Sequence, residues 1–284
     1  MAKRELRTGL DPDRPQGSQG TSHAMSNIHQ VMRLSAAVLI GLSLACGQRF
    51  RLSSYPTSEA LYQAAIREYQ ARRWDNAVQA FEKLTLELPA RDTLLPLAHF
   101  FLAQSHVGRR EYLLAAQSFN RLAESFATDT LADNAKFEAA RSYQKLWRKP
   151  DLDPVHGELA LATFQELLAL YPDSDLKDEA ERELKVLNEW FATKDYETGL
   201  HYFRRKAFDS AIIYFKDVVR LYPQSQKARD AYLRLAEAYD IIRYREDKND
   251  VCTTLHNQYP RDRDVIGVCG PRTVTEAAKR DTTR

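Results

Sequence analysis

The sequence is poor in the residues that form sharp turns, and neither sign of charge dominates. It has only 10 glycines and 11 prolines among 284 residues, which disfavours a fold made of many tight turns. Lysine and arginine number 41 against 39 aspartates and glutamates, so no global field would recruit nucleic acid. The 44% of hydrophobic residues is enough for a sizeable core, and we expect that core to be mostly helical.

Long apolar runs are also scarce, and the one that exists is short. It extends from Leu34 to Ala45. As a helix it would rise about 18 Å, well short of a hydrocarbon core of about 30 Å, so it would not span a membrane. Arg33 precedes the run, small residues end it and Cys46 follows at once, which is the layout of a signal peptide.

The residues around Cys46 indicate lipidation. Ser43-Leu44-Ala45-Cys46-Gly47 resembles the bacterial lipobox, in which the cysteine is acylated and becomes the mature N-terminus, although Leu is usual in the place of Ser43. A covalent N-terminal lipid on Cys46 would hold the protein on a membrane. By the same resemblance, Gly47 favours the periplasmic face of the outer membrane over the inner one. The alternatives are an ordinary secretory signal and a short buried helix with an incidental thiol.

Four positions recur with the spacing of the tetratricopeptide repeat (TPR), a hairpin of two helices. The template has small residues at positions 8 and 20, Phe at 24 and Pro at 32, because two helices touch at the first pair, Phe fills the space between hairpins and Pro ends the second helix. The five matches are Ala65, Ala77, Phe81 and Pro89; Ala103, Ala115, Phe119 and Ala127; Ala140, Ala160, Phe164 and Pro172; Gly199, Ala211, Phe215 and Pro223; and Ala236, Lys248, Cys252 and Pro260.

Two irregularities interrupt the pattern. The third repeat has eight extra residues between its helices, including Lys149 to Pro154, and proline does not fit a helix interior, so we expect a loop there. Between the third and fourth repeats, Leu176 to Trp190 has helical periodicity and predicts the first part of an unusually long helix.

The predicted fold is therefore all-α, a TPR superhelical solenoid of about five helical hairpins over residues 58–260. Residues 1–45 are interpreted as a leader and lipoprotein signal peptide, with Met25 favoured as the true start. Residues 46–57 would be a lipid-anchored linker, and residues 261–284 a polar C-terminal tail that is too polar to pack.

A peptide-binding groove is predicted on the first helices of the N-terminal repeats. In TPR proteins these helices line the concave face, and position 5 is Tyr62, Phe100, Phe137, Tyr196 and Leu233 in the five repeats. The predicted groove consists of Tyr62, Ile66, Tyr69, Phe100, Val107 and Phe137. The alternative is that the aromatic residues pack in the core, because position 4, usually a core position, is polar in repeats two to four.

Catalysis has little support in the sequence. The seven histidines form no HExxH motif, and CxxC, Walker A and GxSxG motifs are absent too, so we expect neither an enzyme nor a metal or other cofactor beyond the lipid. After lipidation of Cys46, Cys252 and Cys269 remain. In an exported protein they either form a disulfide or stay as thiols, with Cys252 buried where Phe usually packs.

The ordered set of features resembles the BamD family, the TPR lipoproteins of the outer-membrane β-barrel assembly machinery. The most specific parts are Asp151-Leu152-Asp153-Pro154-Val155-His156 before the second helix of repeat three, Leu170-Tyr171-Pro172 with Asp173-Ser174 after it, and Ala180 to Gly199 followed by His201-Tyr202-Phe203-Arg204-Arg205.

The resemblance implies a scaffold with several partners. Its C-terminal repeats would hold the POTRA-domain β-barrel assembly subunit, alongside accessory lipoproteins. Its N-terminal repeats would bind the aromatic C-terminal signals of nascent outer-membrane barrel proteins. Its lipid anchor would attach the protein to the membrane. Two alternatives stay open: a periplasmic TPR adaptor for envelope or peptidoglycan machinery, and a carrier of a small apolar ligand.

Overall fold

A computed structural model describes residues 50–272, and its helices belong to one compact unit that begins at Leu52. The predicted acylation site Cys46, the signal peptide and the leader lie outside the described residues. So do residues 273–284. Within the described range, no helix combines the length and the apolar character that crossing a membrane requires.

The described residues form helices and no strands. A short 3-10 turn, η1 (Leu52–Ser54), precedes the first long helix. The helices are α2 (Ser58–Gln70), α3 (Trp74–Glu87), α4 (Leu94–Gly108), α5 (Tyr112–Ser125), α6 (Ala132–Leu146), α7 (Val155–Leu170), α8 (Lys177–Arg204), α9 (Phe208–Leu221), α10 (Gln226–Ile242), α11 (Arg245–Gln258) and α12 (Arg263–Cys269). The prediction of an all-α fold is confirmed.

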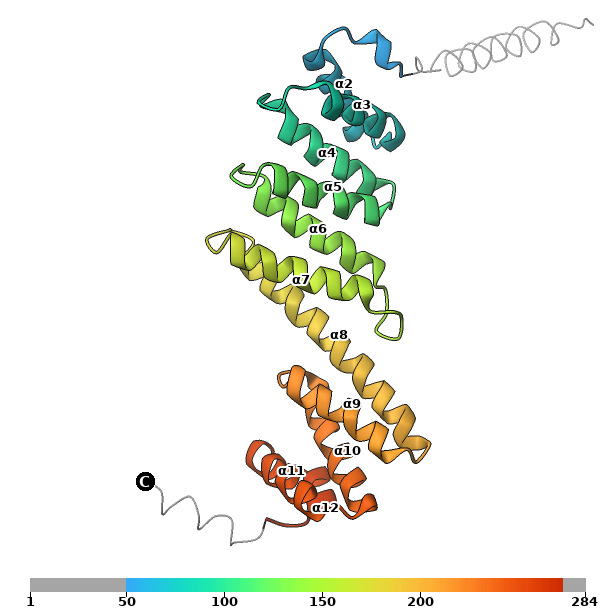
Figure 1. Ribbon diagram of the computed structural model, residues 1–284, viewed down its shortest axis with the longest axis vertical. Helices are drawn as coiled ribbons and strands as arrows, with labels where there is room; N and C mark the ends of the chain where they lie inside the picture. The colour runs from blue at the N-terminus through green and yellow to red at the C-terminus, as the bar shows by residue number, and fades with distance from the viewer. Residues whose placement is uncertain (1–49, 273–284) are drawn as a thin grey trace, which may run out of the picture. The chain divides into compact units, whose positions relative to one another are not determined.

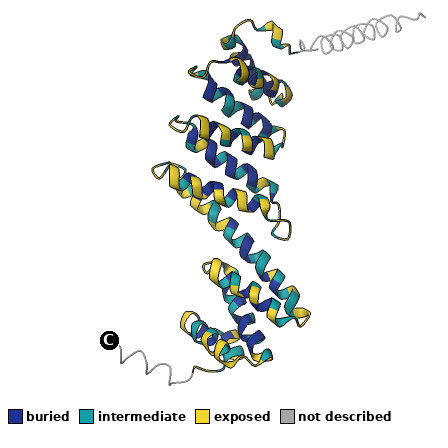
Figure 2. Cartoon of the chain, viewed as in Figure 1, coloured by how far each residue is buried: buried dark blue, intermediate teal, exposed yellow. Residues whose placement is uncertain are grey.

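Helices α2 to α11 pair into five consecutive hairpins, and each helix packs against the next along the chain (Figure 1). Because successive helices reverse direction, the turns inside the hairpins lie at one edge of the stack and the turns between hairpins at the other. Buried residues follow the inner faces of the helices (Figure 2). A hairpin alone could not bury these faces, so stacking is what creates the core.

The template positions explain how closely the helices pack. The small residue at position 20 is fully buried in the first four repeats, and so is the Phe at position 24. Glycine at position 8 of the fourth repeat is required by space, because a Cβ atom on Gly199 would lie 2.8 Å from the ring of Phe215. The register predicted from the sequence is confirmed by this burial.

The third hairpin has the irregular turn that its extra residues predict. Pro154 immediately precedes α7, and Asp153 accepts a hydrogen bond from the amide of Val155. Trp147 turns back into the core against α7, where a Cβ atom on Gly157 would lie only 2.1 Å from its ring. The loop is therefore anchored by a buried tryptophan that only glycine can accommodate.

The long helix predicted between repeats three and four is also confirmed. Helix α8 has 28 residues, and it contributes to two parts of the core. Leu187 and Phe191 pack with the third hairpin, whereas Ala192 and Tyr196 pack with the fourth. One helix thus connects the two hairpins without a flexible joint.

The segment after Pro260 corrects the expectation of a tail too polar to pack. Residues Arg263–Cys269 form α12, which packs against α10 and α11. Val265 is fully buried in a cluster with Leu233 and Leu255. The sequence suggested a tail because residues 261–284 are mostly polar, and the residues that bury Val265, namely Leu233 and Leu255, lie in earlier helices.

Candidate functional site

The aromatic residues at position 5 pack against the Phe at position 24 of their own hairpin. This contact recurs in four hairpins with nearly constant geometry. The ring centroids are 6.1 Å apart for Tyr62 and Phe81, 5.5 Å for Phe100 and Phe119, 5.5 Å for Phe137 and Phe164, and 5.6 Å for Tyr196 and Phe215. Edge-on and tilted aromatic pairs of this kind stabilise a core beyond the area that they bury.

This packing separates the six residues of the predicted groove into two groups. Tyr62 and Phe137 are only 9% and 3% exposed, and burial raises the pKa of the Tyr62 hydroxyl. These two side chains are core residues. For them the alternative interpretation holds, in which the aromatic residue at position 5 packs in the core because position 4 is polar. The other four, Ile66, Tyr69, Phe100 and Val107, are half-buried and remain partly accessible.

The polar residues at position 4 explain why the aromatic side chains are in the core. Lys136 is almost fully buried, yet its ammonium lies 2.9 Å from the Glu166 carboxylate on α7 and donates to the Asn120 side chain on α5 at 3.2 Å. A buried cation is tolerated when it is paired in this way. In the third hairpin, position 4 therefore links α6 to α5 and α7 by polar contacts, and Phe137 at position 5 supplies the apolar volume.

The half-buried residues form a small apolar surface on the first two hairpins. The Tyr69 ring contacts Trp74 with 5.4 Å between centroids and Phe101 with 5.2 Å. Phe100 also contacts Phe101, at 5.8 Å. We call the accessible parts of Ile66, Tyr69, Phe100 and Val107 the N-terminal apolar strip. It is smaller than the groove predicted from six residues, because two of those residues face inward.

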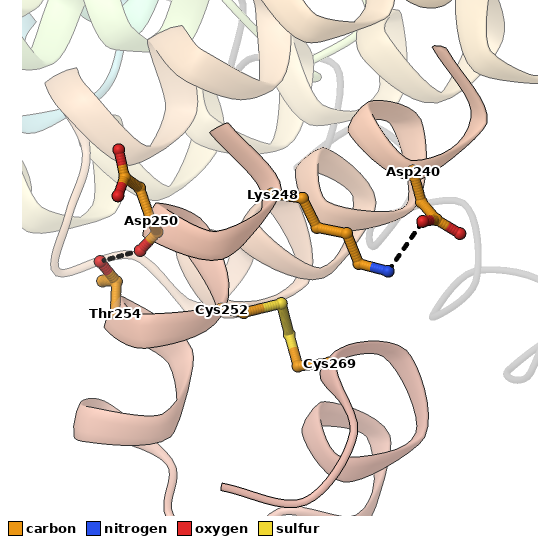
Figure 3. Close-up of a disulfide and its surroundings, with 6 residues drawn as sticks. All are labelled: Asp240, Lys248, Asp250, Cys252, Thr254 and Cys269. Carbon is orange, nitrogen blue, oxygen red and sulfur yellow. Dashed lines mark hydrogen bonds and ion pairs between the residues drawn. A yellow bond between two sulfur atoms is a disulfide. The ribbon is translucent and has the colours of Figure 1, made fainter. Parts of the chain in front are cut away.

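Within residues 50–272, only the last hairpin is fastened by a disulfide. A disulfide joins Cys252 on α11 to Cys269 at the end of α12 (Figure 3). Of the two alternatives for these cysteines, a disulfide or thiols, the structure has the disulfide. Lys248, which occupies the small-residue position 20, extends its ammonium to the Asp240 carboxylate at 2.9 Å. Both departures from the template thus link α11 to a neighbouring helix, Lys248 to α10 and Cys252 to α12.

A pocket of about 490 Å³, which was not predicted from the sequence, lies between α8, α10 and α12. Its lining includes Tyr196, Leu233, Arg234 and Gly267. Arg234 lies over the Phe203 ring, 5.8 Å from its centroid, and donates to Glu237. The pocket was not foreseen because one wall is α12, which was expected to be unfolded.

Arg229 fastens that wall. Its guanidinium donates to the carboxylates of Asp262 and Asp264, each at 2.6 Å, and to Asp230 at 2.7 Å. These hydrogen bonds raise the pKa of Arg229 and are the main reason that the pKa of Asp262 is lowered to about 2. Charge-assisted bonds and a disulfide together hold the short α12 helix in place.

Comparison with known families decides the affiliation of this chain. The profile of the YfiO family, described as "Outer membrane lipoprotein", matches residues 55–255, from before α2 to within α11 of the fifth hairpin. The chain belongs to the YfiO family. The match ends before α12, so Cys269 and the carboxylates that bind Arg229 lie beyond the residues that the YfiO profile covers.

Several relatives share the name "Outer membrane protein assembly factor BamD". The protein of Caulobacter vibrioides is 23% identical over 80% of this chain and 76% of its own length. The protein of Vibrio cholerae is 34% identical over a shorter part, 32% of this chain and 38% of its own length. That of Xylella fastidiosa strain Temecula1 is 23% identical over 66% of this chain and 56% of its own length.

Solved structures with similar folds are TPR proteins. The TPR domain of P58(IPK) is 14% identical with a TM-score of 0.41, over 74% of this chain and 53% of that one. The TPR2AB domain of yeast Sti1 in complex with pHSP90 is 17% identical with a TM-score of 0.38, over 73% and 80%.

Proposed function

We propose that this YfiO-family chain is an outer membrane protein assembly factor, a lipid-anchored periplasmic TPR scaffold without enzymatic activity. The observation that carries the proposal is the family match over residues 55–255, including the irregular third repeat, together with the shared name of the relatives. In this role Cys46 is the acylated residue that anchors the chain in the outer membrane. The partners are a POTRA-domain β-barrel subunit, accessory lipoproteins and nascent barrel proteins.

Two surfaces suit two different partners. The N-terminal apolar strip offers partly accessible rings and aliphatic side chains, which suit the aromatic C-terminus of a nascent barrel protein. The pocket beside α12 combines arginine and carboxylate side chains with apolar walls, which suits a folded domain such as a POTRA domain. The two surfaces lie on different hairpins, so the two binding activities should be separable.

The scaffold role is tested by identifying what the full chain holds in the membrane. The tagged full-length protein is extracted from outer membranes in mild detergent, and its partners are identified by mass spectrometry. A co-purifying β-barrel protein with POTRA domains is the expected result. Recovery of peptidoglycan enzymes instead, without any such barrel protein, would favour the envelope adaptor.

The anchor is tested on the same preparation. Intact mass should show acylated Cys46 as the first residue, because the apolar run before it is too short to anchor the protein otherwise. The Cys46→Ser variant should leave the outer-membrane fraction when no partner is present. Full retention of that variant would contradict the lipid anchor.

Peptide recognition is tested by substituting half-buried residues of the N-terminal apolar strip. Ile66→Ser with Val107→Ser should weaken binding of a peptide with an aromatic barrel-type C-terminus by on the order of tenfold, since both side chains are accessible parts of the strip. The matched control is Leu113→Ser with Leu114→Ser, two exposed leucines on α5. Fluorescence anisotropy with labelled peptide gives the affinity, and a melt establishes folding.

Three outcomes of the peptide experiment are distinguishable. Loss of binding in the strip variant alone supports the strip. Equal loss in both variants, or none in either, contradicts it. If the strip variant keeps its affinity for the peptide but no longer binds an apolar dye, the alternative function as a carrier of a small apolar ligand is favoured.

A further inference from the structure

Every non-glycine residue with positive φ in the described range is a cation at the same point of its hairpin. These residues are Arg72, Arg110, Lys206 and Arg243, with φ of 56°, 63°, 61° and 68°. Each stands at template position 15, one or two residues after the end of the first helix. Glycine adopts this left-handed conformation freely, whereas residues with a Cβ atom rarely do. A recurrent cation here is therefore not explained by backbone preference.

The helix dipole does not require a cation at this position either. A positive charge is favoured near the C-terminus of a helix. Cations in the last helical turn serve that purpose with ordinary backbone angles, as Arg67 does in α2 and Arg204 in α8. Glycine at position 15 would then be free of strain, so the long basic side chains at this position point to another use.

These four side chains are exposed and, within residues 50–272, none of them forms an ion pair. Their neighbours differ. Arg73 is paired with Glu68 at 2.6 Å, and Arg109 is paired with Glu111 at 3.0 Å. Glu68 and Glu111 are thus paired with Arg73 and Arg109, and the position-15 cations remain available to an external anion.

The turns inside the five hairpins share one edge of the stack, which we call the hairpin-turn edge (Figure 1). Between the helix ends, these turns contain nine lysines and arginines and three aspartates and glutamates. The turns at the opposite edge, including the one before α12, contain two arginines and five aspartates. The near-neutral chain is therefore polarised, with basic turns at one edge and acidic turns at the other.

We propose that the hairpin-turn edge docks on anionic phospholipid headgroups of a membrane. These four cations, on four of the five hairpins, fit a surface with many phosphates. Each cation near such a surface raises binding about fivefold. The inference rests on the proposed function in one respect: acylated Cys46, 26 residues before Arg72, would place the first hairpin close to a membrane. An acidic face of a partner protein is the competing occupant.

The test replaces the four cations by glycine, the residue that adopts positive φ most readily. In the full chain with Cys46→Ser, the variant Arg72→Gly, Arg110→Gly, Lys206→Gly and Arg243→Gly should melt no lower than the parent, because glycine relieves the positive φ. Co-sedimentation is measured with vesicles of phosphatidylglycerol and phosphatidylcholine, and with phosphatidylcholine alone. Binding to the anionic vesicles should fall at least about tenfold at low salt, with no change on neutral vesicles.

A control variant removes the two arginines of the turns at the opposite edge, together with one cation each from the start of α8 and the end of α9. Arg91→Gln, Lys177→Gln, Arg220→Gln and Arg261→Gln changes the net charge equally and should retain binding to anionic vesicles. The apolar run before Cys46 is present in every variant, so its own affinity for lipid cancels in the comparison. Equal loss of binding in both variants, or loss in neither, would overturn the proposal.

Failure of the lipid proposal and failure of the scaffold function give different experimental results. If the glycine variant binds vesicles like the parent but loses a co-purifying protein, the edge is a protein interface and the lipid proposal is wrong. If the POTRA-bearing partner is never recovered but the glycine variant alone loses vesicle binding, the scaffold function fails while the lipid surface stands.

Discussion

The first four hairpins and the fifth follow the same template but are held together by different interactions. In the first four, a buried Ala or Gly admits the neighbouring helix, and a Phe at position 24 meets an aromatic ring at position 5. In the fifth, Lys248 and Cys252 occupy the corresponding positions and form an ion pair and a disulfide. Position 5 there is Leu233, which packs on α12 rather than on a Phe.

The difference shows that the last hairpin of a repeat array must be stabilised by interactions other than those between neighbouring hairpins. An internal hairpin is covered on both sides by its neighbours, so close apolar packing is sufficient. The fifth hairpin has no sixth hairpin within the described residues, and the short α12 helix covers it instead. Seven residues bury little area, and covalent and ionic bonds compensate for that.

The largest effect is expected from overpacking the regular hairpins. Ala160→Phe and Ala211→Phe each place a ring at a fully buried helix contact, which should lower the free energy of unfolding by about 3 kcal/mol or more. Thermal melts measure this. Leu159→Phe on the exposed side of α7 is the control and should melt like the parent. Parent-like melting of both alanine variants would mean that these contacts are not close-packed.

The disulfide should affect the last hairpin alone. Replacing Cys252 and Cys269 by serine removes a cross-link between residues 17 apart, which should favour local opening of α11 and α12 by about 3 kcal/mol. Hydrogen exchange should therefore accelerate by on the order of a hundredfold in α12, with no change in α4 and α5 of the same molecule. Equal acceleration in both regions would mean that the hairpins unfold as one unit.

A smaller, pH-dependent effect is expected at Arg229. Its hydrogen bond lowers the pKa of Asp262 from an ordinary 3.8 to about 2. A lowered pKa means that this carboxylate stabilises the folded state above about pH 4, and that the contribution is lost as the pH falls toward 2. In Arg229→Gln, the Asp262 carboxyl carbon should titrate by NMR closer to the ordinary value. An unchanged midpoint would assign the shift to the backbone amides of α12.

The smallest effect is expected from restoring the template residue in the fifth hairpin. Lys248→Ala removes an exposed ion pair with Asp240, and pairs of this kind contribute little. The melting temperature should stay within about two degrees of the parent. A large loss would show that the ion pair, and not only the disulfide, fastens α11.

Most of the fold could be predicted from the sequence because its signals are local. The steps between small residues, Phe and Pro fixed the register of the hairpins, and Pro154 fixed the irregular turn. The candidate site was predicted less well. Ile66, Tyr69, Phe100 and Val107 are partly accessible, but Tyr62 and Phe137 are core residues, and position in a helix does not reveal which of two faces an aromatic ring will join.

The sequence by itself determined the number of hairpins, their order and the long α8 helix, because spacing and periodicity are properties of neighbouring residues. Only the tertiary structure decided that α12 folds back on α10, that Cys252 joins Cys269, and that Arg229 binds two carboxylates more than 30 residues away. The physical reason is that a short helix has too few local interactions to be stable alone. Its stability comes from contacts with residues that the chain brings together only after the hairpins have stacked.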